Sequence, residues 1–414
     1  MKTIGIIAEF NPFHYGHEYL IAEAKRLMQA DFCIVVLSGN FVQRGTAALM
    51  DKYTRAKMAL LNGVDLVVEL PVVYATGSAE YFARGAVRLL DKMGVVDYLC
   101  FGSECGDITL LKLAAELLAT EDSAFQKRLQ ECLKKGMSFP LARSQSIDSI
   151  GQSMISEAPL RDSLHEIINQ PNNILGLEYI KALDFFNSKI TPATIKRKGA
   201  GYHEEVFTPG KFCSATAIRK MLKDVAVGQK EATYASLHSF VPENTLSFYK
   251  DPSLLALPSD ISKLLYYKLT LEAERGYTQF FDVSNDISDK IKKNLPKYTT
   301  DDDFIHLLKS KDLTYMRISR CLCHILLDIY AADIGLYTEH DYIFYARMLG
   351  FREDAHHLLK EIKTHSSIPL LSKLADAKHL LSETGMKMLK KDIQAAHIYN
   401  HQMNEYTVPI EKVL

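Results

Sequence analysis

The sequence predicts an α/β protein with a doubly wound parallel sheet in its first 225 residues, followed by an all-helical domain. Three observations predict this fold class. Short, continuously apolar segments occur early in the chain, helix-period segments alternate with them, and the strand-like segments stop near residue 225. Continuous apolar runs are typical of strands buried on both faces, and an alternating order implies a parallel sheet. We therefore divide the chain into residues 1–225 and 226–414.

The first part contains five expected strands, which are Thr3–Ala8, Phe32–Leu37, Leu66–Leu70, Tyr98–Phe101 and Ile190–Ile195. The helices expected between and after them are Glu18–Gln29, Lys52–Asn62, Ser78–Met93, Asn173–Phe186 and one that begins at Ser214. Apolar residues at three- and four-residue spacing predict these helices, and Gly63 and Gly94 provide helix stops.

The second part contains helix-period segments and no expected strand. The helices predicted there are Ile261–Arg275, Ile287–Asn294, Phe304–Lys309, Tyr315–Tyr330, Tyr342–Leu349, Asp354–Thr364 and Ala375–Asn400.

The composition is that of an ordinary globular protein, with 47% hydrophobic and 24% charged residues among 414. Because the formal net charge is −1, a nucleic-acid partner would need a local basic patch. The seven cysteines are scattered, and no apolar run approaches the roughly 18 residues of a membrane span. We expect a cytoplasmic protein without a membrane partner.

A histidine–glycine motif follows the first expected strand, in the segment Asn11-Pro12-Phe13-His14-Tyr15-Gly16-His17. Gly16 allows close approach of the backbone to a ligand, and the N–H groups at the helix start attract an anion. His14 and His17 are three residues apart, so both could donate hydrogen bonds to charge that develops at an α-phosphate. Two alternatives stay open, namely a helix cap and half of a zinc site, although no third ligand at a recognisable spacing supports zinc. We predict no dedicated metal site.

A strand, an (H/T)-x-G-H motif and a helix in this order resemble the nucleotidyltransferases and class I aminoacyl-tRNA synthetases of the HIGH superfamily. Those proteins carry a second motif of the form S-(S/T)-T-x-I-R. Here the matching segment is Lys211-Phe212-Cys213-Ser214-Ala215-Thr216-Ala217-Ile218-Arg219, in which Ala215 departs from the pattern. Its hydroxyls and guanidinium suit a triphosphate, although alone it is equally a capped helix. The catalytic residues that we predict are His14, His17, Ser214, Thr216 and Arg219.

Four further segments make the resemblance specific to one family within this superfamily. They are Ser38–Gly45, Phe101–Glu104, Pro171–Gly176 and Lys196–His203. Together with Ala8–His14 they look like the bacterial tRNA(Met) cytidine acetate ligase family. The resemblance covers essentially the whole chain and is densest through residues 1–220. It implies a Rossmann-like HIGH-superfamily domain at residues 1–225 that binds ATP and carries out catalysis, and a tRNA-binding helical domain at residues 226–414.

The resemblance implies a ligase that uses ATP to convert acetate to acetyl-adenylate. The acetyl group then passes to the wobble cytidine of elongator tRNA(Met), giving N(4)-acetylcytidine. ATP and Mg²⁺ are the implied cofactors, with Mg²⁺ carried by the triphosphate and no protein cage. The implied ATP-binding residues are Ile7, Ala8, Glu9, Phe10, Asn11, Pro12, Phe13, His14, Tyr15, Gly16, His17, Glu18, Tyr19, Leu20, Gly102, Asn172 and Arg197.

Two smaller expectations concern the same site. We expect Ala8, Phe10 and Asn11 to line a small acetate pocket. Asparagine is a favourable N-cap, so we also expect Asn172 or Asn173 to cap the helix that follows.

Basic residues gather before and inside the expected helix at 315–330. The tRNA-binding residues predicted are Arg44, Lys309, Lys311, Arg317 and Arg320. Arg317 and Arg320 share a helix face and suit phosphate contacts, whereas the alternative is an ordinary solvated face. Two other functions stay open, namely a small-molecule adenylyltransferase and a non-catalytic RNA-binding protein with a relic nucleotide fold. The oligomeric state is also open.

Overall fold

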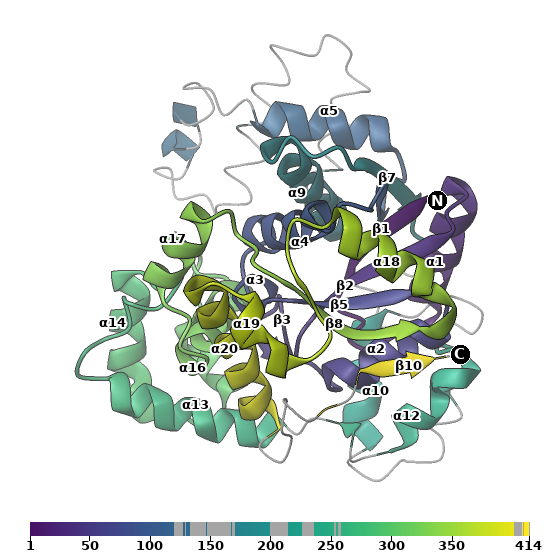
Figure 1. Cartoon of the computed structure of the whole chain (residues 1–414). Coiled ribbons are helices and arrows are strands. Elements are labelled where there is room, and N and C mark those ends of the chain that lie inside the picture. Colours follow the sequence, from purple (N-terminus) through teal and green to yellow (C-terminus); the bar gives the residue numbers. More distant parts are fainter. Residues whose placement is uncertain are drawn as a thin grey trace.

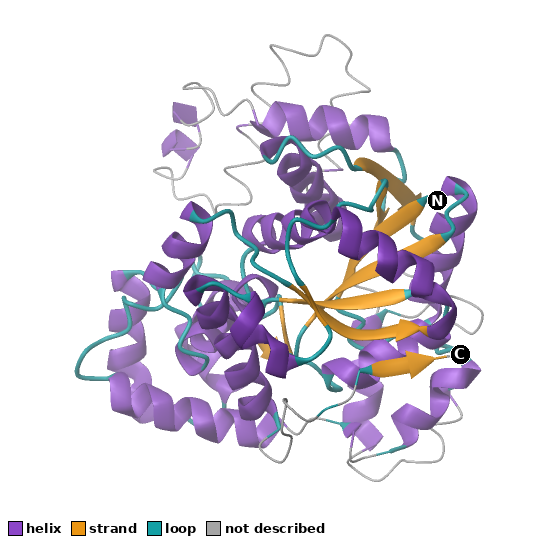
Figure 2. Cartoon of the chain, in the orientation of Figure 1, coloured by secondary structure: helices purple, strands orange, loops and turns teal. Residues whose placement is uncertain are grey.

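The computed structural model describes residues 1–119, 127–128, 130–132, 146, 167, 170–198, 214–225, 236–251, 254–255, 258–400, 408 and 410–413. Within this part, an eight-stranded sheet runs in the order β10-β8-β5-β2-β1-β6-β7, with β9 paired to β8. Figures 1 and 2 show this sheet at the centre with helices around it. Its strands are β1 Thr3–Ala8, β2 Phe32–Ser38, β5 Leu66–Leu70, β6 Tyr98–Ser103, β7 Thr191–Lys196, β8 Ala346–Arg352, β9 Leu370–Leu371 and β10 Glu411–Val413.

The five strands β5-β2-β1-β6-β7 pair in parallel, which confirms the predicted doubly wound sheet. Side chains of β1 and β2 alternate between two buried clusters, so both faces of the sheet are covered. One face packs against α1 Tyr15–Met28, α2 Lys52–Leu61 and α10 Ala215–Val225. The other face packs against α4 Ala79–Met93, α5 Ile108–Ala119 and α9 Pro171–Phe185.

The strand order reverses between β1 and β6, because the chain builds outward to β2 and β5 and then returns to the other side of β1. Ligands of such sheets bind at the carboxyl ends of the strands next to this reversal. The segment after β1 carries the histidine motif, and β6 ends at Gly102 and Ser103. The fold therefore places both predicted segments at its natural ligand-binding edge.

The later part of the chain supplies most of the remaining helices, many of which lie to the left of the sheet in Figure 1. The longer ones are α13 Pro258–Glu272, α14 Asn285–Asn294, α15 Asp301–Leu308, α16 Tyr315–Leu326, α17 Ala331–Glu339, α18 His356–His365 and α20 Glu383–Tyr399. The short helices are α3 Val72–Ala75, α12 Leu246–Lys250 and α19 Ala377–Leu380, with 3₁₀ turns at Glu243–Thr245, Leu295–Lys297, Glu353–Ala355 and Leu374–Asp376. None of the described helices has the length and apolar character needed to cross a membrane.

The helix predicted at Tyr342–Leu349 is wrong, because residues Ala346–Arg352 form strand β8 instead. β8 pairs antiparallel with β5, and β9 and β10 pair with β8, so the expectation of no strand after residue 225 is also wrong. A short apolar run buried on both faces has no periodicity that separates strand from helix. Residues Ala346–Arg352 form a strand because they pair with the edge of β5 that β2 leaves open. The domain boundary near residue 225 stays a prediction.

Buried charges join β8 to the parallel strands. Glu69 on β5 accepts hydrogen bonds from Lys52 at 2.9 and 3.1 Å, and its second carboxylate oxygen lies 2.9 Å from an Arg347 guanidinium nitrogen on β8. All three side chains are at most 3% exposed. A carboxylate at this depth requires paired cations, so this contact fixes the later part of the chain against the sheet.

Candidate active site

A cavity of about 580 Å³ opens at the carboxyl ends of β1 and β6. Its volume lies in the range of small-molecule and cofactor sites. Its lining residues include Ile7, Ala8, Glu9, Phe10, Asn11, His14, His17, Leu20, Arg44, Gly102, Asn172, Tyr179, Arg197, Ser214, Thr216, Arg219, Met316 and Arg320. We call it the ATP cavity. A smaller recess of about 40 Å³ continues it beside Gly16, Tyr19 and Lys198.

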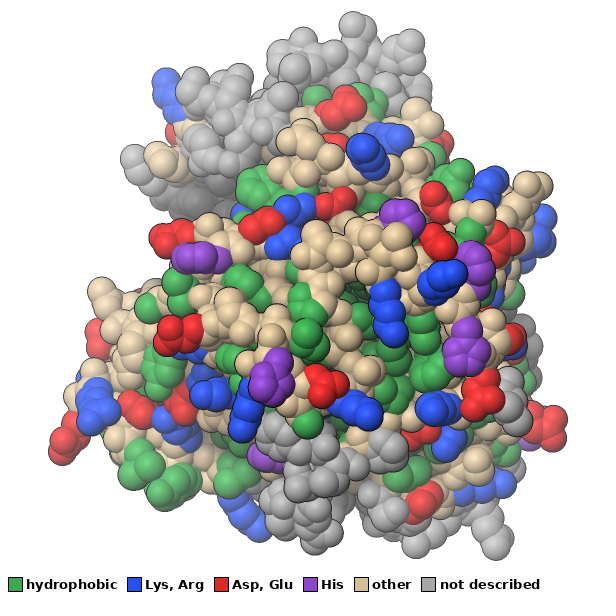
Figure 3. Space-filling view, viewed as in Figure 1, with side chains coloured by type: hydrophobic (Ala, Val, Ile, Leu, Met, Phe, Trp, Pro, Cys, Tyr) green, Lys and Arg blue, Asp and Glu red, His purple; other side chains and the backbone are tan. Residues whose placement is uncertain are grey.

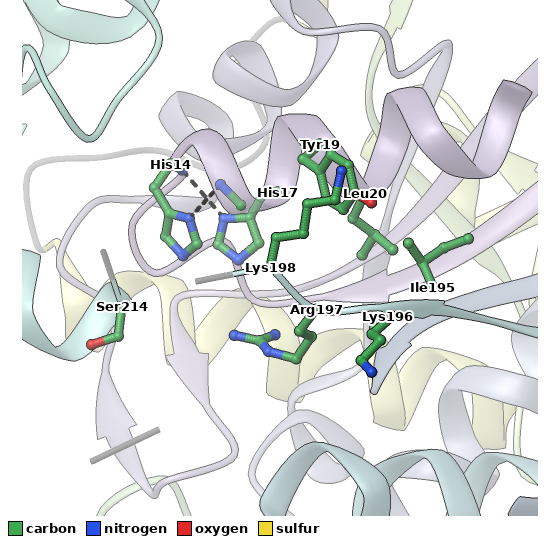
Figure 4. Close-up of a pocket in the computed structure, with 11 residues that line it drawn as sticks. His14, His17, Tyr19, Leu20, Ile195, Lys196, Arg197, Lys198 and Ser214 are labelled. Atoms are coloured by element: carbon green, nitrogen blue, oxygen red, sulfur yellow. Dashed lines mark hydrogen bonds between the residues drawn. The ribbon is translucent and has the colours of Figure 1, made fainter. Parts of the chain in front are cut away.

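The two histidines stand side by side at the start of α1, where Figure 4 shows both rings facing Arg197. Their ring centroids are 3.8 Å apart and nearly parallel. The Gly16 N–H donates to His14 Nδ1 at 3.0 Å, and the His14 N–H donates to His17 Nδ1 at 3.3 Å. The helix-cap interpretation is thus correct for Nδ1 of His14. It does not exclude the phosphate interpretation, because Nε2 of each ring takes no part in the cap.

Because both Nδ1 atoms accept backbone hydrogen bonds, each neutral ring carries its proton on Nε2. Burial, together with the charges of nearby Arg197 and Arg219, lowers the pKa of His14 from 6.5 to about 3. Burial, the neighbouring His14 and Arg197 also lower the pKa of His17 well below its ordinary value. Both imidazoles are therefore neutral N–H donors at physiological pH.

This neutrality predicts a loss of stability in acid. The unfolded chain protonates His14 below about pH 6.5, whereas the folded protein resists protonation down to about pH 3. The unfolded state therefore binds more protons in this window, and stability falls as pH falls, by up to about 1.4 kcal/mol per pH unit. In denaturant titrations between pH 4 and 7, His14→Asn should show a shallower decline than the wild type. The exposed His340→Asn is the control, and equal slopes for His14→Asn and the wild type would contradict the assignment.

The second motif meets the first directly. Arg219 on α10 donates to the main-chain carbonyl of Asn11 at 2.5 Å and to Thr216 Oγ1 at 3.0 Å. Ser214 accepts the Ala217 N–H at 3.2 Å, so the capping that we considered for this segment is present, and Ser214 also lines the ATP cavity. The segment Lys211-Phe212-Cys213 and residues 199–203 lie outside the described residues.

The cavity has a positive electrostatic balance. Among its described lining residues, the guanidinium groups of Arg44, Arg197, Arg219 and Arg320 face a single carboxylate, that of Glu9. Gly102 lies against Arg197, because an added Cβ would sit 3.3 Å from the Arg197 Cγ. Fixed guanidinium groups of this kind suit a polyphosphate. An oxygen-rich cage for a divalent cation is absent from these described lining residues.

Glu104 is a site residue that the sequence reasoning missed. Its carboxylate accepts the Asn172 side-chain amide at 2.6 Å and the backbone N–H groups of Asn172 and Asn173 at 3.2 and 2.9 Å. Asn172 Oδ1 in turn accepts from Arg197 at 3.4 Å. The expected asparagine N-cap of α9 is therefore wrong. The N-cap position is Gln170, and Glu104 satisfies the first-turn N–H groups from outside the helix.

We predict that Glu104→Gln raises the KM for ATP by about tenfold and changes kcat much less, because Asn172 loses the charged acceptor that orients it. The amide keeps the shape of the side chain but offers one oxygen instead of two. Initial-rate kinetics on this variant and on Glu116→Gln, an exposed position on α5, provide the comparison. A KM that is unchanged in both variants would show that Glu104 does not position Asn172.

Several predicted residues lie away from the ATP cavity. Of the segment Ile7–Leu20, the residues Pro12, Phe13, Tyr15 and Glu18 line neither the cavity nor its recess. Phe13 is fully buried in the core, whereas Tyr15 and Glu18 border a separate surface depression. The side chains of Lys309, Lys311 and Arg317 also lie outside the cavity. Arg317 and Arg320 both face Asp282, at 3.6 and 3.9 Å, which offsets part of their charge.

Arg55 is a second residue that the sequence reasoning missed. Its fully buried guanidinium group donates to the carbonyls of Glu9 at 2.6 Å, Ser38 at 3.1 Å and Gly39, and Nε donates to the Met50 carbonyl at 2.9 Å. The carbonyls of Glu9, Ser38 and Gly39 lie where β1 and β2 end, and that of Met50 lies just before α2. Arg55 therefore holds together the strand ends that form one wall of the site.

Comparison with known proteins agrees with this geometry. Residues 1–411 match the family described as HIGH Nucleotidyl Transferase. The tRNA(Met) cytidine acetate ligase of Clostridium perfringens is 40% identical over 402 residues, which is 97% of this chain and 95% of that protein. The protein of the same name from Caldanaerobacter subterraneus is 38% identical over 412 residues, covering 99% and 97% of the two chains.

Two solved structures also match this chain over its full length. Thermotoga maritima TmcAL bound with alpha-thio ATP is 27% identical, with a TM-score of 0.88 and full coverage of both chains. The apo form of that protein gives a TM-score of 0.91 at 28% identity. The chain belongs to the tRNA(Met) cytidine acetate ligase family of the HIGH nucleotidyltransferases.

Proposed function

We propose that this chain activates acetate with ATP and transfers the acetyl group to the wobble cytidine of elongator tRNA(Met), forming N(4)-acetylcytidine. The observation that carries the proposal is the meeting of two neutral, stacked histidines with Arg197 and Arg219 at the ligand-binding edge of the sheet. The substrates are inferred from the family to which the chain belongs, and the site geometry supports chemistry at an α-phosphate.

In the first step, an acetate oxygen attacks the α-phosphorus of ATP. A new P–O bond forms, the bond to the β-phosphate oxygen breaks, and pyrophosphate leaves with that electron pair. His14 and His17 donate Nε2–H to the non-bridging α-phosphate oxygens, where negative charge grows in the transition state. Because acetate is already ionised, the step needs orientation more than a base. Arg197 and Arg219 neutralise the phosphates.

Burial of the catalytic donors suits this role. Neutral N–H donors need no rearrangement of charge when the transition state forms, and a site with little water strengthens their hydrogen bonds. Mg²⁺ binds through substrate phosphates and water more often than through a protein cage. We propose that it enters on the triphosphate near Glu9, where it would supply further charge neutralisation. Ala8, Phe10 and Asn11, which line the cavity, would border the acetate.

The transfer step brings tRNA to the same cavity. We propose that Arg44, Lys309, Lys311, Arg317 and Arg320 contact the RNA, with Arg44 and Arg320 at the cavity wall. On the molecular face in Figure 3, basic side chains are interspersed with acidic ones. A local group of cations beside the site is therefore a better source of RNA affinity than that face. We also propose that the protein is located in the cytoplasm, as the sequence predicts.

Two measurements test the proposal. ATP–pyrophosphate exchange should depend on acetate in the wild type and fall steeply in His14→Ala. Exchange without acetate would favour a small-molecule adenylyltransferase, and no exchange would favour a relic fold. The second measurement uses the Lys309→Ala, Arg317→Ala double variant, whose side chains lie outside the ATP cavity and which should lower acetyl transfer to tRNA about tenfold or more and retain exchange. Loss of exchange in the double variant would contradict the division of roles.

A further inference from the structure

A second cavity of about 520 Å³ lies beside the ATP cavity. It is enclosed by the hairpin of β3 Phe41–Val42 and β4 Thr46–Ala47, by α10, and by the helices α13, α15 and α16. The two cavities share the lining residues Arg44, Thr216, Met316 and Arg219. The second cavity therefore borders the ATP cavity along these four side chains.

The wall between the cavities is held in a fixed shape. Arg219 is tied to Asn11 and Thr216 by the two hydrogen bonds described above. On the hairpin side, Gly45 has a φ of +73°, and an added Cβ would lie 2.5 Å from the Arg320 backbone nitrogen on α16. Ser319 also donates to the Gly45 carbonyl at 3.2 Å. Hairpin and helix are therefore packed together, so the second cavity is present before any ligand arrives.

The lining of the second cavity combines an apolar floor with a charged rim. The buried floor consists of Leu265, Ile305, Leu322 and Cys323. The aromatic rings of Phe41 and Tyr315 border it, and Tyr315 donates to the Asp302 carboxylate at 2.5 Å, which fixes the ring. Arg44, Lys220 and Arg219 form a cationic rim, and the carboxylates of Asp301 and Asp302 also line the cavity.

These features match a single-stranded RNA nucleotide. A nucleobase has apolar faces that stack on aromatic and aliphatic side chains, while the flanking phosphates need cations. The apolar floor is unsuited to pyrophosphate. A free adenine nucleotide binds in the ATP cavity, so a second site for it is not needed. An unpaired pyrimidine fits both parts of the lining, because its base packs on the apolar floor and its phosphates lie beside the cations at the rim.

We propose that the second cavity receives the acceptor cytidine, flipped out of the anticodon loop, and that its exocyclic amine contacts the acetyl group between the side chains that the two cavities share. This inference rests on the proposed function and assigns the place of its second substrate. In the transfer, the amine lone pair forms a bond to the acetyl carbonyl carbon. The bond from that carbon to the AMP oxygen breaks, AMP leaves with the electron pair, and the amine proton passes to solvent water.

The test uses the full chain, ATP, acetate and an anticodon stem-loop of elongator tRNA(Met) with 4-thiouridine at the wobble position. The sulfur of this base occupies the place of the cytidine amine. Ultraviolet cross-linking followed by peptide mapping should place the adduct within residues 41–49, 216–220 or 315–326. An adduct confined to other segments would overturn the inference.

A cavity-filling variant gives a second readout. Thr46 lines the second cavity but not the ATP cavity. Thr46→Phe should lower acetyl transfer at least about tenfold and retain acetate-dependent ATP–pyrophosphate exchange, whereas Thr364→Phe on the exposed side of α18 should alter neither.

The possible results distinguish a failure of the proposed function from a failure of the proposed cytidine site. Absence of acetate-dependent exchange in the wild type would refute the proposed function itself. Normal exchange together with normal transfer in Thr46→Phe would overturn only the placement of the cytidine. Should Thr46→Phe lose exchange as well, the cross-link map of the wild type decides the placement by itself.

Discussion

Replacing His14 with asparagine should lower acetate-dependent ATP–pyrophosphate exchange by about 100- to 1000-fold, the usual cost of one transition-state donor. Asparagine retains an oxygen where Nδ1 accepts the Gly16 N–H, so the cap of α1 survives. It has no counterpart of Nε2–H, which is the atom that we assign to the α-phosphate. The variant therefore separates the structural role of His14 from the catalytic one.

Exchange should be measured at saturating ATP and acetate beside the thermal unfolding midpoint. His17→Asn should behave in the same way, because His17 Nδ1 also accepts a backbone N–H. His340→Asn, at an exposed helix end, is the matched control and should leave exchange unaltered. A His14→Asn enzyme with near-normal exchange and normal stability would show that the imidazole only caps the helix.

Replacing Arg55 with methionine should destabilise the protein by about 3 kcal/mol or more. The change leaves the carbonyls of Glu9, Ser38, Gly39 and Met50 without the donor that they share, in a place that water does not reach. Each buried acceptor that loses its partner costs about 1–3 kcal/mol. Methionine fills a similar volume, so a cavity contributes little. Arg55→Lys should recover part of the loss, since it keeps the charge but reaches fewer carbonyls.

Denaturant unfolding gives this cost directly, with Arg26→Met as the control. Arg26 has an exposed side chain paired with Glu23 at 2.7 Å, and solvent-exposed pairs of this kind contribute little to stability. Because Arg55 holds the turns after β1 and β2, the Arg55→Met protein should also bind ATP more weakly. Unchanged stability in this variant would mean that the turns keep their conformation without the shared guanidinium group.

The parallel half of the fold was predictable because its signals are local. The strands Thr3–Ala8, Phe32–Ser38, Leu66–Leu70 and Tyr98–Ser103 are mostly apolar runs bounded by turn residues, and the alternation with helices implies the sheet. The strand Ala346–Arg352 was not predictable in this way. Its partner β5 lies far earlier in the chain, since Leu66 pairs with Phe351, 285 residues later, and only the folded chain offers that edge.

The residues of the site also fall into two groups, those with a local signal in the sequence and those without one. His14, His17 and the segment Ser214–Arg219 lie in recognisable motifs, so the sequence reasoning found them. Glu104 and Arg55 act on other residues through hydrogen bonds whose partners come from distant segments. A glutamate after a strand and an arginine inside an amphipathic helix carry no local sign of such roles. A buried arginine in α2 becomes informative only when the carbonyls around it are known.

Isotope transfer from acetate tests the central claim, attack at the α-phosphate, more directly than any variant. With ¹⁸O-labelled acetate and the complete tRNA reaction, the account predicts AMP that carries one ¹⁸O atom and unlabelled pyrophosphate, both read by mass spectrometry. The label reaches AMP because the attacking acetate oxygen stays on phosphorus when the cytidine amine takes the acetyl group. Formation of ADP with ¹⁸O in inorganic phosphate would place the attack at the γ-phosphate and contradict the account.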